Sequence, residues 1–285
     1  MSVVFLCVGA AKAGTSWLHA QLARHPECHF REIKELHYFN ALEAGRLGAE
    51  LEKHRRWQVD LLERLARSGQ APSDQQARRL VDRGAWMDVL EKGIEDVPGY
   101  LTYLNGGAGE KAVVGELTPA YALLPELRLR AMAKMAPDVR VLYLMRDPVE
   151  RLWSHIRMMA DRQGGATEDR CAALLDRTIS GRETQIAARS DYAGAIGRLT
   201  RAVPGARLLF EVFEEMVSGE GFRRLCGFLG IGVAVTDGVP VHSGPAVEMT
   251  GRQRQAAADW LVPQYDAARI ALGRMPEGWG HGGRT

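Results

Sequence analysis

A glycine-bounded turn between an apolar strand and a helix, at residues 5–18 (FLCVGAAKAGTSWL), constrains this chain most. An apolar run breaks at Gly9, the turn reaches Gly14, and a helix is expected from Thr15 and Ser16 onward. Glycine lets the backbone approach an anion closely, and the first N–H groups of a helix lack partners within the helix. The stretch therefore predicts a phosphate-binding loop that follows a buried strand.

The spacing from Gly9 to Gly14 fits the start of a Walker P-loop, but the position of the lysine does not. In the Walker motif a lysine follows the second glycine directly. Here that position holds Thr15, and the lysine of the loop is Lys12. The loop thus argues against a standard ATP or GTP site. A P-loop nucleotide kinase or NTPase remains an alternative, in which Asp147, directly after a strong strand, would have to hold the metal.

Length and composition limit the possible classes of protein. A chain of 285 residues with 46% hydrophobic residues can bury a sizeable core, and we expect a single domain over residues 1–285. Lys and Arg total 37 against 35 acidic residues, so nothing indicates a nucleic-acid partner. The four cysteines show no metal-binding spacing, and no apolar run approaches the roughly 20 residues that span a bilayer. We expect a cytoplasmic protein with reduced thiols, no metal and no membrane span.

Short apolar strands alternate with amphipathic helices along the chain. Strands are predicted at about residues 3–8, 28–30, 112–116, 139–145 and 207–212. Helices are predicted from residues 15 and 148 and at about 43–66, 77–95, 100–104, 122–135, 168–180, 190–202, 219–229 and 252–272. This alternation predicts an α/β fold: a three-layer, P-loop-like arrangement with a central parallel sheet flanked by helices.

Four further segments carry expectations of their own. The predicted helices within about residues 41–110 form an insertion that we expect to shape an acceptor pocket. Its candidate wall residues are Trp57, Trp86, Tyr100 and Tyr103, although core packing is the commoner reason for such spacing. Residues 68–76 are expected to be an exposed turn, residues 232–250 a loop, and the glycine-rich tail from residue 278 frayed.

A second cluster of polar residues, RDPVERLWSHI at residues 146–156, follows the strongest apolar strand. Open parallel sheets bind ligands at the carboxyl ends of their strands. Arg146 offers a planar fork of donors for a phosphate, and Ser154 lies eight residues on, about two helical turns, so both can face one ligand. The alternative explanation is that these residues only cap a helix. Because the first loop already predicts an anion site, we favour the explanation that they form a second contact to an anion.

Three motifs occur in this order along the chain: KAGTSWL at residues 12–18, KELHYF at 34–39 and RDPxxRxxS at 146–154. Together they resemble the sulfotransferases that use 3′-phosphoadenosine-5′-phosphosulfate (PAPS) as donor. KELHYFN and GELTPAY (residues 115–121) are similar to the heparan-sulfate-type and bacterial branch. The resemblance spans about residues 3–230, and weakly 248–254. It implies transfer of a sulfuryl group to a hydroxyl or amine of a small-molecule or glycan acceptor, without a metal.

The resemblance also implies which residues bind the donor. The first loop would hold the 5′-phosphosulfate, with Lys12 stabilising the leaving group, and Arg146 with Ser154 would hold the 3′-phosphate. The implied donor-binding set is Lys12, Ala13, Gly14, Thr15, Ser16, Trp17, Arg146, Ser154, Tyr192, Thr250, Gly251 and Arg252. Packing on the core is an alternative explanation for Tyr192, and capping of a helix is an alternative explanation for Thr250.

Two residues compete for the role of general base. Glu35 stands where the heparan-type enzymes carry a glutamate, whereas related small-molecule sulfotransferases use a histidine, for which His37 is the candidate. A carboxylate at this position can take the proton of an acceptor hydroxyl or amine, and we favour Glu35. His37, Tyr38 and Glu116 are the implied acceptor-binding residues.

The chain departs from the family pattern next to Glu116. Several relatives carry a lysine where this chain has Leu117, which removes a cationic group and weakens the case for a polysulfated glycan. Together with the expected cytoplasmic location, this favours a small molecule of secondary metabolism as acceptor. Leu117 also leaves open a non-catalytic nucleotide-binding relative, against which the presence of Lys12 and Glu35 counts.

Overall fold

A five-stranded parallel sheet forms the centre of the computed structural model, which describes residues 2–234 and 247–280. The strands are β1 (Val3–Gly9), β2 (Cys28–Phe30), β3 (Val113–Leu117), β4 (Val139–Met145) and β5 (Leu208–Val212). Their order in the sheet is β2-β3-β1-β4-β5, and each neighbouring pair is parallel. The predicted α/β class is confirmed, with strand ends within about one residue of those expected.

The interior positions of β1 and β4 in the sheet explain why their sequences are continuously apolar. Both faces of β1 and β4 are covered, so Phe5, Leu6 and Leu142 have no exposed surface. The neighbouring strand β3 needs Gly115, because a Cβ there would lie 1.9 Å from the carbonyl oxygen of Phe5. Close approach of the strands, rather than a turn, is therefore the reason for this glycine.

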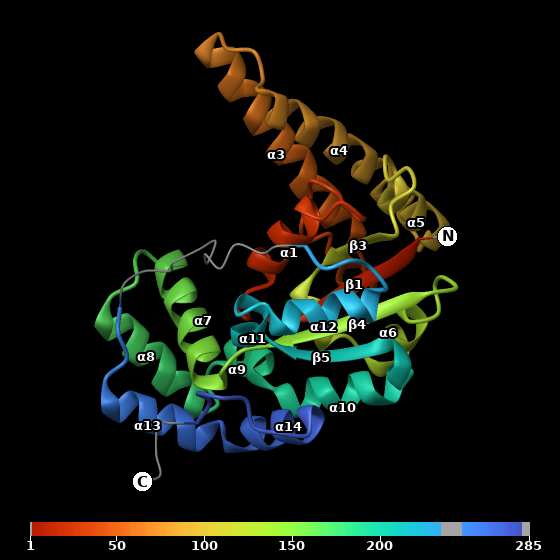
Figure 1. Cartoon of the computed structure of the whole chain (residues 1–285). Coiled ribbons are helices and arrows are strands. Elements are labelled where there is room, and N and C mark those ends of the chain that lie inside the picture. The colour runs from red at the N-terminus through yellow and green to blue at the C-terminus, as the bar shows by residue number, and fades with distance from the viewer. Residues whose placement is uncertain (1, 235–246, 281–285) are drawn as a thin grey trace.

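Helices cover both faces of the sheet, and in Figure 1 α12 and α14 lie on opposite sides of β5. The helices are α1 (Thr15–Arg24), α2 (Tyr38–Glu43), α3 (Leu47–Ser68), α4 (Asp74–Leu90), α5 (Val97–Asn105), α6 (Glu126–Met132), α7 (Pro148–Arg162), α8 (Glu168–Ile179), α9 (Thr184–Ser190), α10 (Tyr192–Ala202), α11 (Phe213–Val217), α12 (Glu220–Leu229), α13 (Gly251–Trp260) and α14 (Val262–Leu272). Short 3-10 helices lie at Pro119–Leu123 and Gly205–Arg207. None of the helices in the described parts of the chain combines the length and the apolar character that crossing a bilayer requires.

Two long helical predictions are wrong, and proline is the reason in both. The segment at 122–135 is a 3-10 turn followed by the short helix α6, because Pro125 occupies its N-cap. The segment at 252–272 is divided at Leu261 into α13 and α14, with Pro263 in the first turn of α14. The other predicted helices are present with boundaries moved by a few residues, whereas α2, α9 and α11 were not predicted. The turn at 68–76 is shortened because Ser73 caps α4 with a capping box.

Helices α3 and α4 of the insertion project from the body as an arm (Figure 1). Three of the four aromatic residues expected to wall a pocket are instead in the core. Trp86, Tyr100 and Tyr103 pack on one another with at most 4% of their surface exposed, and Trp57 lies under the guanidinium of Arg83. Packing of the arm against the body thus explains their spacing.

The C-terminal helices pack against the other end of the molecule. Helix α13 contacts α7 and α8, and together they enclose a second, smaller apolar core. In the glycine-rich tail Trp279 is buried, so the prediction of fraying is wrong for that residue. Residues 235–246 of the predicted loop and 281–285 of the tail lie outside the described residues.

Candidate functional site

A cavity of about 660 Å³ opens at the carboxyl ends of the strands. The segments that follow all five strands contribute to its wall, and α7 and α9 complete it. Its lining residues are Ala11, Lys12, Gly14, Thr15, Ser16, Trp17, Lys34, Glu35, His37, Pro119, Ala120, Arg146, Ser154, His155, Arg157, Met158, Arg162, Arg189 and Phe213.

The topology of the sheet explains why the cavity forms there. Strand β1 lies between β3 and β4. The chain therefore forms β2 and β3 on one side of β1 first, and then β4 and β5 on the other side. In open α/β sheets, ligands bind at such a reversal of strand order. The loop that ends at Gly14 occupies this position.

The start of α1 is arranged to bind an anion. Gly14 is its N-cap, with φ of 83°, and no side chain caps the helix. A Cβ at this position would also lie 2.0 Å from the ring of Phe213. The glycine therefore brings the first turn of α1 close to the cavity, where backbone N–H groups and the positive end of the helix favour negative charge.

Lys12 lies in this loop in the left-handed region, with φ of 70°. Burial lowers the pKa of its ammonium group, and the positive charges of Arg157 and Arg162 lower it further. Lys12 forms no ion pair within the described residues. A cation held among other cations, without an acidic partner, is an arrangement that an anionic ligand would stabilise.

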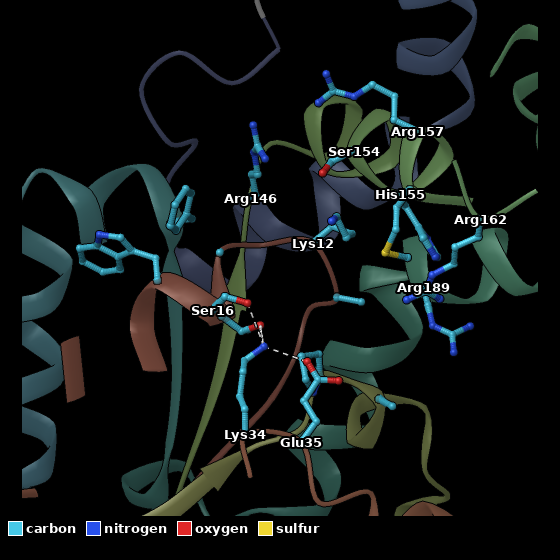
Figure 2. Close-up of a pocket in the computed structure, with 18 of the residues that line it drawn as sticks. Lys12, Ser16, Lys34, Glu35, Arg146, Ser154, His155, Arg157, Arg162 and Arg189 are labelled. Atoms are coloured by element: carbon cyan, nitrogen blue, oxygen red, sulfur yellow. Dashed lines mark hydrogen bonds and ion pairs between the residues drawn. The ribbon is translucent and has the colours of Figure 1, made fainter. Parts of the chain in front are cut away.

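Lys34 and Glu35 lie across the cavity from Ser154 and Arg157 (Figure 2), and His37 contacts Glu35, so that the three residues form one connected group. The Lys34 ammonium lies 2.8 Å from Oε1 of Glu35 and donates to Oγ of Ser16 at 3.0 Å. Nε2 of His37 lies 3.4 Å from Oε2 of Glu35. One lysine thus joins the candidate base to the first turn of α1.

The charges of this group explain its titration. Burial alone would raise the pKa of Glu35, but the hydrogen bond from His37 and the charge of Lys34 outweigh it and lower the pKa to about 2. The hydrogen bond to Glu35 raises the pKa of His37. His37 also has a positive φ of 54°. The two candidate bases therefore form one coupled pair.

Glu116 holds the segment that carries this pair. The N–H of Leu36 donates to Oε2 of Glu116 and to Oγ1 of Thr118, and the hydroxyls of Tyr100 and Tyr121 also donate to Glu116. Burial raises the pKa of Glu116, which is 2% exposed. Glu116 is therefore hydrogen-bonded to the residue between Glu35 and His37, and it is not among the residues that line the cavity.

Arg146 and Ser154 come to the cavity as the motif predicts, from the end of β4 and from α7. The side chain of Asp147 caps α7 by accepting from the N–H of Glu150. The hydroxyl of Tyr192 accepts from the N–H of Arg146 and donates to its carbonyl oxygen. Asp147 thus caps the helix, as the alternative explanation has it, and Arg146 lines the cavity. Its contact with a phosphate stays a prediction.

Several candidate residues do not line the cavity. Ala13, Tyr38, Glu116 and Tyr192 are buried beside it. Thr250 caps α13 through a capping box with Gln253, which is the helix-capping role given above as its alternative explanation. The residues that the structure leaves out of the lining are Ala13, Tyr38, Glu116, Tyr192, Thr250, Gly251 and Arg252. Their assigned binding roles stay predictions.

Several residues of the cavity were not found from the sequence. Lys34 stood in the KELHYF motif without a role, and Arg157 and Arg162 follow Ser154 at helical spacing on α7, which is a signal that could have found them. Arg189 comes from α9 and is brought in only by the fold. Buried Arg151 supports the loop, since it donates to the carbonyl oxygen of Ala11 and to Ser190. Among the described residues, no group of three or more His, Cys, Asp or Glu side chains is placed to hold a metal ion.

Comparisons with known proteins agree with this architecture. A sulfotransferase from Alicyclobacillus acidocaldarius is 21% identical and has a TM-score of 0.65, covering 98% of this chain and 99% of that one. The sulfotransferase domain of the Synechococcus PCC 7002 olefin synthase is 15% identical, with a TM-score of 0.53, covering 97% of this chain and 96% of that one. The sulfotransferase domain from the curacin biosynthetic pathway is 15% identical, with a TM-score of 0.54, covering 98% and 93%. A search of curated proteins found no significant match.

At these identities the solved structures establish the fold alone. The family follows from the sequence profile described as the sulfotransferase family, which matches residues 5–234. That range contains the loop before α1, the Lys34–His37 segment and the start of α7, the segments that form most of the cavity. The chain therefore belongs to the sulfotransferase family.

Proposed function

We propose that this protein transfers a sulfuryl group from PAPS to a hydroxyl or amine of a small acceptor. The observation that carries the proposal is the convergence of the uncapped start of α1, Lys12, Arg146 and Glu35 on one cavity. An anion site, a second phosphate contact and a carboxylate base are the parts that this transfer needs. A kinase is less well supported, because position 15 is threonine and the profile that matches is that of sulfotransferases.

On the donor side, the start of α1 would hold the 5′-phosphate, with the hydroxyls of Thr15 and Ser16 beside it. Arg146 and Ser154 would hold the 3′-phosphate, the group by which the enzyme distinguishes this donor from other adenine nucleotides. Lys12 would donate to the oxygen that bridges sulfur and phosphorus, and its charge would stabilise the negative charge that develops there.

On the acceptor side, Glu35 would accept the proton of the attacking hydroxyl or amine. The acceptor atom then forms a bond to sulfur while the bond from sulfur to the bridging oxygen breaks. The electron pair of that bond stays on the 5′-phosphate, and adenosine 3′,5′-bisphosphate leaves. The reaction is an in-line displacement, so positioning and fixed charges provide most of the catalysis, as in phosphoryl transfer.

Lys34 gives a physical reason why Glu35 can act as a base although its pKa is low without the donor. The ammonium group of Lys34 contacts both Ser16 and Glu35. Oxygens of the 5′-phosphosulfate next to Ser16 would compete with Glu35 for this ammonium, and loss of that contact would raise the pKa of Glu35. A base with a higher pKa accepts a proton more readily, so donor binding would activate Glu35.

The insertion would act on the acceptor through an adjoining cavity of about 450 Å³. His37 lines both cavities, and Arg46, Glu50 and Lys53 line the second one. A small secondary metabolite extending from Glu35 past His37 would meet the start of α3. Free, buried cysteines accord with a cytoplasmic setting for this single-domain enzyme.

The first test is donor binding in the presence of EDTA. We expect adenosine 3′,5′-bisphosphate to raise the melting temperature without magnesium, because a ligand that binds only the folded state stabilises it. Arg146→Ala should weaken binding of the bisphosphate by about 1.5–3 kcal/mol. Adenosine 5′-phosphate, which lacks the 3′-phosphate, should bind wild type and variant alike.

Two outcomes would count against the proposal. Stabilisation by ATP with magnesium but not by the bisphosphate would exclude a PAPS site. Binding of the bisphosphate without sulfate transfer to any member of a broad acceptor panel would favour a non-catalytic nucleotide-binding protein. Mass spectrometry of extracts treated with enzyme and PAPS would identify the acceptor by the mass of one added sulfuryl group.

A further inference from the structure

Two arginines on the wall of the main cavity have no part in the donor site described above. Arg162 is the last residue of α7 and Arg189 lies near the end of α9. Both line the cavity, and the close-up shows them together, away from Arg146 and Ser154 (Figure 2). They are brought to one place by different helices.

Their contacts leave them available to a ligand. Nη1 of Arg189 donates to the carbonyl oxygen of Gln185 in its own helix, which leaves the other guanidinium N–H groups for further bonds. Within residues 2–234 and 247–280, neither arginine pairs with a carboxylate. Among the described residues that line the cavity, Glu35 is the one acidic residue, and Lys34 and His37 already contact it.

The donor does not account for these two charges. Arg162 lies eight residues beyond Ser154, about 12 Å along α7, so it is displaced from the 3′-phosphate contact. Lys12, Lys34 and Arg146 already face the phosphates and the sulfuryl group in the proposed donor site. Both arginines also contribute to lowering the pKa of His155, after burial and Arg151, which agrees with their position near His155 in the cavity wall.

We infer that Arg162 and Arg189 bind an anionic oxyacid group of the acceptor, a carboxylate or a phosphate, and thereby direct its hydroxyl or amine towards Glu35. Guanidinium groups bind both oxyacids with paired hydrogen bonds, which fix orientation as well as position. The inference rests on the proposed function and deepens it. The two arginines would also supply positive charge to the acceptor site from α7 and α9. In β3 this chain has Leu117 where several relatives carry a lysine.

The test uses the full chain saturated with adenosine 3′,5′-bisphosphate, whose binding is measured first. Calorimetric titrations then compare phenyl phosphate, phenylacetate and the neutral 2-phenylethanol. We expect at least one anion to bind about tenfold or more tightly than the alcohol, and the tighter of the two identifies phosphate or carboxylate as the preferred group.

Matched variants assign the effect to the two arginines. Arg162→Gln with Arg189→Gln should weaken the anion about tenfold or more and leave the bisphosphate within about twofold of wild type. Arg223→Gln, at an exposed position on α12 outside the cavity, is the control and should change neither. The double lysine variant, which keeps both charges, should retain part of the anion affinity and shows that the fold tolerates substitution.

The inference is overturned if the double glutamine variant binds the anion as wild type does, or if the alcohol binds as tightly as the anions. It is also overturned if the bisphosphate and the anion weaken equally, because the arginines would then serve the donor. Failure of wild type to bind the bisphosphate is a different result, and it would contradict the proposed function itself.

Discussion

Lys12 and Glu35 serve different halves of the proposed reaction, although both line one cavity. Lys12 lies in the loop before α1 and would touch the donor in the ground state. Glu35 lies beyond β2, where it contacts Lys34 and His37. Substitutions at the two positions should therefore separate turnover from donor binding.

Glu35→Gln keeps the size and the hydrogen bonding of the side chain but removes the base, so turnover should fall about 10²–10⁴-fold. Its affinity for adenosine 3′,5′-bisphosphate should hardly change. Lys12→Ala should lower both turnover and donor affinity. Steady-state kinetics and calorimetry on both variants give the comparison. If Glu35→Gln keeps near-normal turnover on the true acceptor while His37→Ala loses it, the base is His37.

The sequence identified the residues that lie inside recognisable motifs. Lys12, Gly14 and Arg146 lie between the end of a strand and the start of the next helix, and Ser154 lies about two turns further along α7; all four line the cavity. Arg189 could not be found in this way, because its place beside Arg162 depends on how α9 packs against α7. Trp86 was misassigned for the complementary reason: periodicity does not distinguish an aromatic residue of the core from one that lines a pocket.

At the scale of single elements, the first turn of α1 depends on Gly14. Gly14→Ala would place a Cβ at a positive φ and against Phe213, so it should displace the turn, weaken donor binding and destabilise the fold by about 1–3 kcal/mol. Gly219→Ala is the matched control, since Gly219 is also an N-cap with positive φ, but a Cβ there has no atom of the described part of the chain within 4 Å. Urea unfolding and calorimetry compare the variants.

For the control we expect only the cost of the left-handed backbone, about 1–2 kcal/mol, with unchanged binding of the bisphosphate. Equal donor affinity in the two variants would show that the approach of α1 to the cavity does not depend on Gly14.

The elements themselves were largely predictable, because apolar periodicity marks buried strands and amphipathic helices. Their ends were less so: Pro263 divides a helix that is continuous by periodicity.

At the scale of the whole molecule, buried histidines should make stability fall in mild acid. Burial, reinforced by nearby arginines, lowers the pKa of His155 to about 3, and burial likewise lowers that of His19 to about 4. Below the unfolded value of about 6.5 the unfolded chain binds more protons than the folded one, so the free energy of unfolding decreases as the pH falls towards these values.

Replacing His155 should therefore flatten this dependence. Between pH 6.5 and 5, His155→Gln should lose about 1–2 kcal/mol less free energy of unfolding than wild type does, measured by urea unfolding. His37→Gln should act in the opposite sense. The raised pKa of His37 stabilises the fold below about pH 6.5, and that stabilisation disappears as the pH rises through the folded value. Parallel profiles for His155→Gln and wild type would contradict the prediction.

Lys12 and His37 share the left-handed backbone conformation, which costs a side chain with a Cβ about 1–2 kcal/mol. Glycine would relax the chain at both positions, yet it would remove the two side chains to which we assign functions. Selection for heat resistance, in nature or in the laboratory, would therefore favour substitutions at these two positions, and such substitutions would lower the activity. A heat-stable variant that keeps its turnover has to gain its stability elsewhere, in the α3–α4 arm or on the surface.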